Sequence, residues 1–368
     1  MFVAFNQQHQ LTTLLAYQAT EIPRLRQQQW FCPQCRQPVF LRAGAACTPH
    51  FAHYRRSDCQ LAHETATHLV GKQFLYHYFG QRGYQCQLEV FLPVLQQRPD
   101  LLLTRGGQQL AIEYQCSPLS LARLKQRTAG YSGSQLPVVW ILGPRYIQKN
   151  LKNRQLRFLN QSVSLGYYLL FLESSRFLLW HHIQQIGLSP QYGYHVQSLA
   201  QTAPATKRQL GQPSLAQQVA YLQRQLQYRQ HFWQQLQLVC YRQHRHLLMA
   251  PLWCHTLQPT PPILKCSLFA LRVYFLLTFE QQSVILPQAL TDFRQHYQFL
   301  FQPTGRQFAP QQVTVLTALV ADLVTQGYLG VIAQGWCWRR QPIWFKSVPD
   351  KLAVAAKTRK KTSQEVFD

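Results

Sequence analysis

The chain has 368 residues, 46% of them hydrophobic, which is enough to bury the cores of two or three domains. Lys and Arg number 37 against 13 Asp and Glu, and the net charge of +24 favours a polyanionic partner, nucleic acid before an anionic membrane. The longest apolar stretches, near residues 165–179 and 267–279, contain charges and are too short to span a membrane. The opening MFVAFNQQHQ has no signal-peptide pattern, so the ten cysteines predict reduced or metal-bound thiols in a cytoplasmic protein.

The first 57 residues predict a small unit held together by a metal. A CxxC knuckle is followed by two histidines in a C-x2-C-x14-H-x2-H pattern, which suits tetrahedral Zn²⁺. The predicted ligands are Cys32, Cys35, His50 and His53, and Cys47 and Cys59 are alternative ligands. A redox-active CxxC is disfavoured because no thioredoxin-like strand precedes it.

Residues 61–80 predict an amphipathic helix, followed by a strand over residues 84–91. Glu64, His68 and Lys72 recur at i, i+4 and i+8, so they line one face of that helix. Such a polar stripe is usually a solvated face. The order of elements distinguishes this helix, because it carries a carboxylate and precedes the strands that contain Asp100 and Glu113.

Two carboxylates follow on a predicted β-hairpin. Asp100 heads the strand 100–104, Arg105-Gly106-Gly107 is a turn signal, and the second strand covers residues 108–116. Along that strand Glu113 and Gln115 share one face. Paired carboxylates suit a hard divalent cation such as Mg²⁺ and phosphodiester hydrolysis. The plainer interpretation is a turn aspartate and an ordinary edge-strand glutamate.

The order of elements around this hairpin predicts an α/β fold. A helix over 119–128 and a buried strand over 136–142 follow, which implies a parallel strand pair with a right-handed crossover. An α-β-β-β-α-β order with carboxylates on the first helix and the middle hairpin is a restriction-endonuclease-like arrangement. We expect this core to cover residues 58–185, with strands at 166–172 and 176–183 that complete it or flank it.

The rest of the chain predicts a mainly helical C-terminal domain over residues 214–350. A linker over 200–213 leads into one long Gln-rich helical stretch, 215–243, with further helices within 264–297 and 311–326. The Cys and His residues of 240–266 are irregularly spaced, so buried free thiols are favoured over a second zinc site. Residues 351–368 predict a disordered basic tail that adds phosphate attraction or only solubility.

Taken together, CPQC, PHFAH, HETATHLVGK, RPDLLL, IEYQCS and WILG resemble the competence protein CoiA family, over about residues 1–145. The resemblance implies a PD-(D/E)xK nuclease-like domain in an intracellular protein of natural DNA transformation. It places Cys32, Cys35, His50 and His53 at zinc-binding positions. It makes Glu64 the first-helix acid, Asp100 the acid of the PD motif, and Glu113 with Gln115 the ExK-type motif.

One position departs from the nuclease pattern, because Gln115 stands where many such nucleases place a lysine. An amide can position the attacking water but cannot supply positive charge to the transition state. Lys72, two helical turns from Glu64, is the predicted spatial substitute.

The leading prediction is a DNA-processing protein in which Glu64, Asp100 and Glu113 bind one or two Mg²⁺ or Mn²⁺ ions and Gln115 positions water. Its DNA is expected to be single-stranded, with phosphates neutralised by basic side chains: Arg98, Arg123 and Arg127. A first rival is a non-catalytic DNA-binding adaptor that helps a recombinase load on single strands. A second is a defence-type restriction nuclease.

Overall fold

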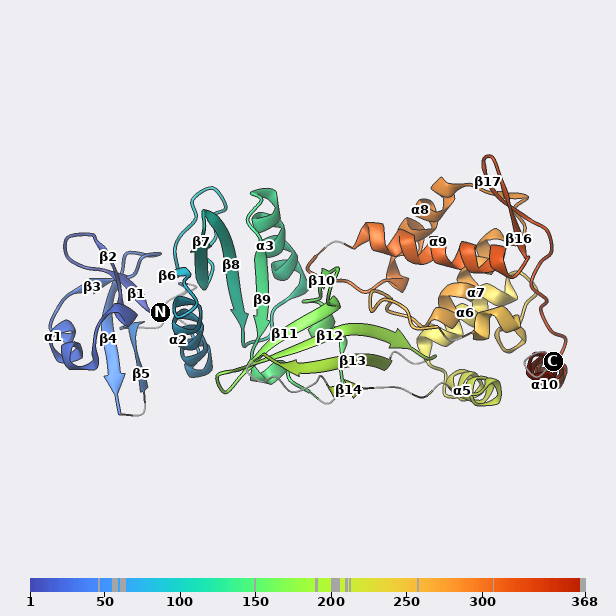
Figure 1. Cartoon of the computed structure of the whole chain (residues 1–368), viewed down its shortest axis with the longest axis horizontal. Coiled ribbons are helices and arrows are strands. Elements are labelled where there is room, and N and C mark those ends of the chain that lie inside the picture. Colours follow the sequence, from blue (N-terminus) through green and yellow to red (C-terminus); the bar gives the residue numbers. More distant parts are fainter. Residues whose placement is uncertain are drawn as a thin grey trace.

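The computed structural model describes residues 1–45, 47–54, 59, 64–148, 150–188, 191–199, 206–208, 211, 213–256, 258–306 and 308–364. Its elements follow one another along an elongated molecule (Figure 1), with a small sheet at one end and the C-terminal helices at the other. No helix in the described ranges is long and apolar enough to cross a membrane.

The N-terminal unit is a five-stranded sheet in the order β2-β1-β3-β4-β5. Its core forms where Trp30 packs on Phe51 with ring centroids 5.0 Å apart, beside buried Leu25 and Leu41. The elements are β1 (Val3–Phe5), β2 (Leu11–Thr13), α1 (Ile22–Arg26), β3 (Trp30–Phe31), β4 (Pro38–Gly44) and β5 (Cys47–His53).

The predicted hairpin and parallel pair lie in one half of a nine-stranded sheet, the half that ends at the edge strand β6 (Gln85–Leu88). Strands β6, β7 (Leu101–Arg105) and β8 (Gln108–Gln115) are antiparallel. Helix α3 (Leu121–Gly133) then connects β8 to β9 (Val138–Leu142), and β9 pairs with β8 in parallel. The parallel pair is therefore confirmed. Gly106 and Gly107 make the β7–β8 turn with φ angles of 55° and 77°.

The sheet continues beyond β9 with strands that lie next to the C-terminal half. In order across it the strands are β14-β13-β12-β11-β9-β8-β7-β6, and β10 pairs with β11. The added elements are α4 (Asn153–Leu156), β10 (Asn160–Ser162), β11 (Gly166–Glu173), β12 (Arg176–Ile186), β13 (Gln191–Ser198) and β14 (Thr206–Arg208).

Helices α2 and α3 cover opposite faces of β8. Ile112 and Tyr114 join a buried cluster with Leu69 and Leu75 of α2 (Ala66–Gly80), whereas Ala111 joins the cluster that contains Leu124 and Tyr131 of α3. Side chains on a strand alternate between its two faces, so Glu113 is directed toward α3.

The C-terminal half is mainly helical and contains a three-stranded sheet in the order β15-β17-β16. Apart from Arg272, helix α7 is apolar on all sides and almost wholly buried, so the other helices pack around it. The elements are α5 (Leu215–Gln227), α6 (His231–Tyr241), α7 (Leu268–Phe279), β15 (Val284–Ile285), α8 (Pro287–His296), α9 (Ala309–Thr325), β16 (Leu329–Ile332), β17 (Gly335–Trp338) and α10 (Val348–Gln364).

Two sequence predictions for this half are wrong. The stretch 215–243 is two helices, because the chain turns between α5 and α6, where Arg229 has a φ of 50°. Residues 351–364 of the predicted basic tail are helical rather than disordered, since α10 runs to Gln364, and residues 365–368 lie outside the described residues. Lys351 of this helix is fully buried and donates hydrogen bonds to the carbonyls of Leu248 and Ala250, which fixes the start of α10 to the domain.

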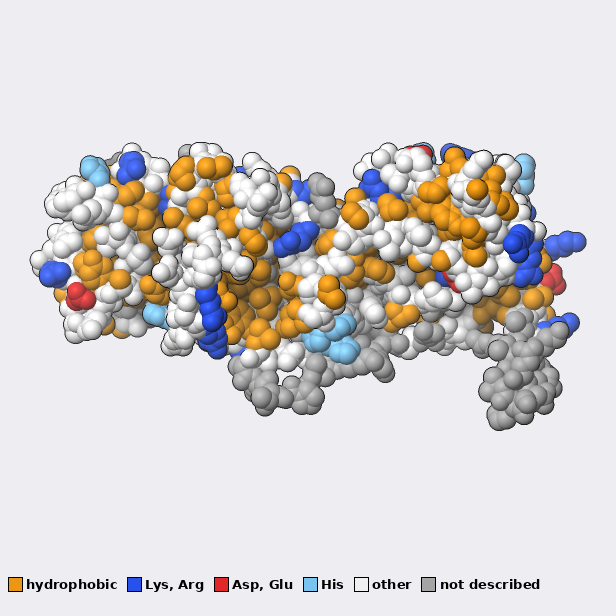
Figure 2. Space-filling model, turned by 45° about the horizontal axis from the view of Figure 1, so that its top comes forward, with side chains coloured by type: hydrophobic (Ala, Val, Ile, Leu, Met, Phe, Trp, Pro, Cys, Tyr) orange, Lys and Arg blue, Asp and Glu red, His pale blue; other side chains and the backbone are white. Residues whose placement is uncertain are grey.

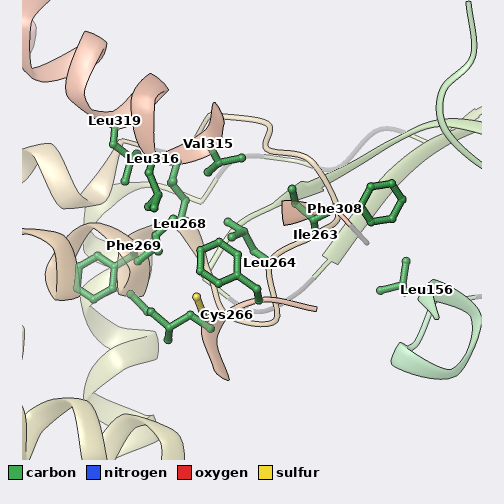
Figure 3. Close-up of a cluster of buried hydrophobic side chains, with 14 of the residues drawn as sticks. Leu156, Ile263, Leu264, Cys266, Leu268, Phe269, Phe308, Val315, Leu316 and Leu319 are labelled. Atoms are coloured by element: carbon green, nitrogen blue, oxygen red, sulfur yellow. The ribbon is translucent and has the colours of Figure 1, made fainter. Parts of the chain in front are cut away.

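One hydrophobic core extends from the α3 side of the sheet into the C-terminal helices. Figure 3 shows Leu156 and Phe308 on one side of this cluster and Phe269 and Leu319 on the other, with Ile263 and Leu264 between them. The side chain of Arg306 adds polar links, donating to the Val138 carbonyl at 2.6 Å and to Asn160 at 3.1 Å. Residues predicted as a nuclease-like core and as a helical domain thus share apolar packing.

Candidate functional site

A cleft of about 870 Å³ lies where α2, the start of β7, the end of β8 and α3 meet, and Pro33 and Gln34 of the CxxC knuckle reach it. Of the carboxylates that the structure describes, only Glu64 and Asp100 line this cleft. Its cationic lining consists of His68 and three arginines, namely Arg98, Arg123 and Arg127. The cleft therefore combines a small acidic centre with a basic surround.

The acidic centre is a hydrogen-bonded chain of three side chains. Thr65 caps the N-terminus of α2 by accepting from the His68 N–H, which places Glu64 just before the helix. His68 then bridges Glu64, at 2.9 Å from Nδ1 to Oε1, and Asp100, at 3.3 Å from Nε2 to Oδ2. Asp100 also accepts from the Tyr114 backbone N–H at 2.9 Å, so β8 fixes its position.

The charged groups of this centre shift one another's pKa values. Burial alone would raise the pKa of both acids, but Lys72 lowers the pKa of Glu64 well below its usual range and His68 lowers that of Asp100. Burial would lower the pKa of His68, but the adjacent Asp100 carboxylate raises it to about 9. At neutral pH the centre therefore holds two carboxylates and an imidazolium.

Lys72 lies behind this centre and does not line the cleft. Its side chain is 1% exposed and donates to both Glu64 and Glu89. Those two carboxylates outweigh the burial and raise the pKa of Lys72, so it stays protonated. Glu89 is buried in turn and accepts from the Phe2 backbone N–H at 3.1 Å, and the Met1 ammonium pairs with Glu64 at 2.7 Å. The predicted substitute lysine is thus placed to position Glu64.

Glu113 is separate from the Glu64, His68 and Asp100 group. Its fully buried carboxylate accepts hydrogen bonds from Arg127 and, at 2.5 Å, from the Tyr131 hydroxyl, both on α3. Burial raises the pKa of Glu113 to about 7, with Arg127 opposing the shift and Asp100 adding to it. Its second oxygen, Oε2, has no hydrogen-bond partner among the described residues.

Gln115 and the three arginines differ in which protein groups hold their side chains and in how exposed they are. The Gln115 amide donates to the Ser117 carbonyl at 2.6 Å, and Arg98 donates to the Glu89 carbonyl at 2.6 Å. Arg127 is held by Glu113, whereas Arg123 is exposed on the first turn of α3 and donates to Gln126 at 3.0 Å. Arg123 is thus the most accessible of the three predicted phosphate contacts.

The CxxC knuckle forms a group that can hold a metal ion, but its members differ from the predicted set. Cys32, Cys35, His53 and Cys59 offer ligand atoms that all lie within 4.8 Å of one another. Cys35 Sγ is 3.2 Å from His53 Nε2, and Cys32 Sγ is 3.7 Å from Cys59 Sγ. Three sulfurs and one imidazole are a donor set that fits a structural tetrahedral site.

The structure leaves His50 outside this group. His50 and His53 lie three residues apart on β5, and an odd spacing directs two side chains to opposite faces of a strand. The His50 ring instead contacts the Thr48 carbonyl at 2.7 Å. Cys59, the alternative ligand in the sequence, takes the fourth position.

Sequence reasoning did not assign roles to three residues of the site. His68 was visible on the same helix face as Glu64 and Lys72, so its i+4 spacing was the available signal. Glu89 is one of only 13 acids, but nothing in its own strand marks it. Tyr131 reaches Glu113 only through the packing of α3 on the sheet, for which the sequence gives no local signal.

The donor atoms of the cleft fit a hard divalent cation in part. Glu64, His68 and Asp100 offer ligand atoms within 4.8 Å of one another, and carboxylate oxygens are what Mg²⁺ and Mn²⁺ prefer. Glu113 lies outside that distance limit, although its buried and unpartnered Oε2 is the kind of atom that a cation would satisfy.

Comparison with known proteins identifies the class to which this arrangement belongs. Residues 64–215 match the family described as "Competence protein CoiA, nuclease-like domain", and residues 14–62 match "Competence protein CoiA, N-terminal domain". The chain belongs to the CoiA family of competence proteins, with a nuclease-like domain. This confirms the family suggested by the sequence motifs.

A particular relative is Competence protein CoiA of Bacillus subtilis (strain 168), which is 28% identical over 194 residues. The match covers 50% of this chain and 51% of the relative, so the chain spans about half the length of that protein. No solved structure gives a significant match.

Proposed function

We propose that this protein is a metal-dependent deoxyribonuclease of the PD-(D/E)xK type that processes incoming DNA during natural transformation. The observation that carries the proposal is the cleft in which Glu64 and Asp100, bridged by His68, are surrounded by three arginines. Acidic ligands for a cation beside cations for phosphate are the two components that phosphodiester hydrolysis needs.

In this proposal Glu64 and Asp100 hold Mg²⁺ or Mn²⁺, with Glu113 as a third carboxylate reached by a small movement. A bound ion would polarise the scissile phosphate and lower the pKa of its bound water. His68 and the Tyr114 N–H orient Asp100, and buried Lys72 positions Glu64. Gln115, once its amide leaves the Ser117 carbonyl, positions the attacking water.

The proposed substrate is single-stranded DNA. Arg98, Arg123 and Arg127 offer positive charge along the cleft, which attracts any phosphate backbone. Phe91 also lines the cleft and is 43% exposed, and an exposed aromatic ring offers a stacking surface for an unpaired base. We further propose that the Cys32, Cys35, His53 and Cys59 group holds a structural Zn²⁺.

A second candidate function, a DNA-binding adaptor that helps a recombinase load, is favoured by one observation. None of the described residues that line the cleft is a lysine, and Lys72 is buried with its charge matched by Glu64 and Glu89. An adaptor needs the basic cleft but not the acidic centre.

The two candidates are separated by following cut products and bound fraction together. Purified full-length protein is mixed with labelled single- and double-stranded DNA in Mn²⁺, with Asp100→Asn as the test variant and exposed Asp292→Asn as its matched control. The nuclease predicts products from the wild type and the control, and at least a ~100-fold loss in Asp100→Asn with binding retained. Binding by all three proteins with no product contradicts the nuclease and supports the adaptor.

A further inference from the structure

Three histidines form a second cluster of metal-binding side chains, on strands outside the cleft. His181 and His182 lie on β12 and His195 on β13, and their ligand atoms lie within 4.8 Å of one another. His181 and His195 are cross-strand partners in the register. Figure 2 shows histidine side chains gathered at the surface in the middle of the molecule.

A β-bulge explains how two neighbouring residues of one strand can both reach His195. The register of β12 with β13 shifts between His181 and Gln184, and His182 has a φ of 50°. Trp180 and Ile183 both join the large core although they are three residues apart, so the bulge accommodates one extra residue between them. His182 is thereby brought to the side of His181, and their Nδ1 atoms are 2.6 Å apart.

A backbone hydrogen bond holds the bulge in an uncommon conformation. The His182 backbone N–H donates to the Leu165 carbonyl at 2.8 Å, which fixes the extra residue in place. A φ of 50° is uncommon for a residue other than glycine, and such positions are found more often at functional sites. The bulge and this hydrogen bond therefore hold His182 beside His181.

One nitrogen of the cluster lacks the partner that a buried imidazole normally has. His181 is 8% exposed and its Nε2 has no hydrogen-bond partner among the described residues. No carboxylate belongs to the cluster.

We propose that His181, His182 and His195 bind a second Zn²⁺ ion, with the fourth position open to water. Three imidazole nitrogens suit Zn²⁺, whereas Mg²⁺ prefers oxygen ligands. Tetrahedral Zn–N bonds place nitrogens about 3.3 Å apart, and small rotations bring the rings to that separation. His182 is exposed and His195 half-buried, so the open position faces solvent.

An ion bound here would cross-link β12 and β13 at the bulge. The bound ion would keep its full charge, since all three ligands are neutral, and would add to the positive surface of the protein. The proposal does not depend on nuclease activity, because its ligands lie on β12 and β13 rather than in the cleft.

The test is the zinc content of tag-free, full-length protein after dialysis against metal-free buffer. Wild-type protein is expected to hold two equivalents. His195→Asn and His182→Asn are each expected to lose one and Cys59→Ser to lose the other, whereas His231→Asn, on α6, keeps both. Asn is chosen at position 182 because it tolerates a positive φ, so the bulge is retained.

Reconstitution with Co²⁺ tells the two sites apart. Only the cysteine site gives sulfur-to-cobalt charge-transfer absorption, so the histidine site is expected as visible ligand-field bands that His195→Asn removes without changing the charge-transfer band. One zinc equivalent that Cys59→Ser removes and the histidine variants leave in place would overturn the proposal. Equal cobalt spectra for the wild type and His195→Asn would do the same.

Discussion

At the scale of single residues, strand geometry decides which side chains of the N-terminal unit can share a metal. His53 lies on the same side of β5 as the knuckle cysteines, and the odd spacing to His50 excludes the latter. Burial raises the pKa of the Cys32 thiol to about 12, so a bound cation must displace its proton.

The ligand set leads to a matched pair of variants. Cys59→Ser is expected to remove the zinc of the N-terminal unit and to lower its melting temperature, because a unit with so small a core depends on the metal. His50→Asn is expected to retain the zinc. Elemental analysis with a parallel thermal melt checks both, and retention of this zinc by Cys59→Ser with its loss in His50→Asn would reverse our assignment.

The sequence allowed some site residues to be predicted and not others. Acids are so rare in this chain that Glu64, Asp100 and Glu113 could be singled out as candidates. Strand alternation predicted that Glu113 faces away from Ile112 and Tyr114, but it did not show that Glu113 lies apart from the Asp100 group. The choice between Cys59 and His50 depends on which face of a strand each side chain occupies. The Arg127 and Tyr131 contacts of Glu113 depend on the packing of α3, which residue spacing does not specify.

At the scale of elements, α2 approaches β8 as closely as it does because residue 71 is glycine. A Cβ at Gly71 would lie 2.0 Å from Cε1 of Tyr114, whose ring also stacks on His68 with centroids 5.6 Å apart. The same strand residue supplies the backbone N–H that Asp100 accepts. The helix that carries His68 is thus seated on the strand that orients Asp100.

Gly71→Ala tests this packing. Overpacking is expected to lower the free energy of unfolding by about 1–3 kcal/mol, because the Tyr114 ring must move. Gly80→Ala, on the same helix with open space at its Cβ, is expected to be neutral or up to about 1 kcal/mol more stable. Urea denaturation midpoints measure both, and equal midpoints would contradict the close contact.

Helix α10 owes its position to a buried lysine, and this makes stability depend on pH. Burial lowers the pKa of Lys351 from 10.5 to about 8 in the folded chain. Below pH 8 both folded and unfolded states carry the proton, and between pH 8 and 10.5 only the unfolded state does. The free energy of unfolding is therefore reduced at low pH, where the buried lysine is charged, and it increases as the pH rises through that window.

Lys351→Met supplies the comparison, because it has no group to titrate there. From below pH 8 to above pH 10.5, the wild type is expected to gain about 3 kcal/mol of unfolding free energy relative to the variant. Denaturation at a series of pH values measures the difference. Parallel pH profiles for the two proteins would show that Lys351 is not buried as described.

At the scale of the whole molecule, contacts connect the CxxC knuckle to the cleft, and the sheet to the C-terminal helices. The CxxC knuckle reaches the cleft through Pro33 and Gln34, and one apolar core continues from the sheet into the C-terminal half. Local patterns gave most strands near the hairpin, because alternation and turn residues are local signals. The same patterns predicted a single helix where α5 and α6 form, because no Gly or Pro marks the turn at Arg229.

The proposed nuclease requires that a divalent ion in this cleft contacts the phosphate that is cut. The most direct measurement is cleavage of a single-stranded oligonucleotide with one phosphorothioate at the cut position, compared with its normal counterpart in Mg²⁺ and in Mn²⁺. We predict cleavage of the normal strand in both metals, slow cleavage of the phosphorothioate in Mg²⁺, and recovery in Mn²⁺, which accepts sulfur more readily. If neither metal supports cleavage of the normal strand, or if both strands are cut equally in EDTA, the ion does not have this role.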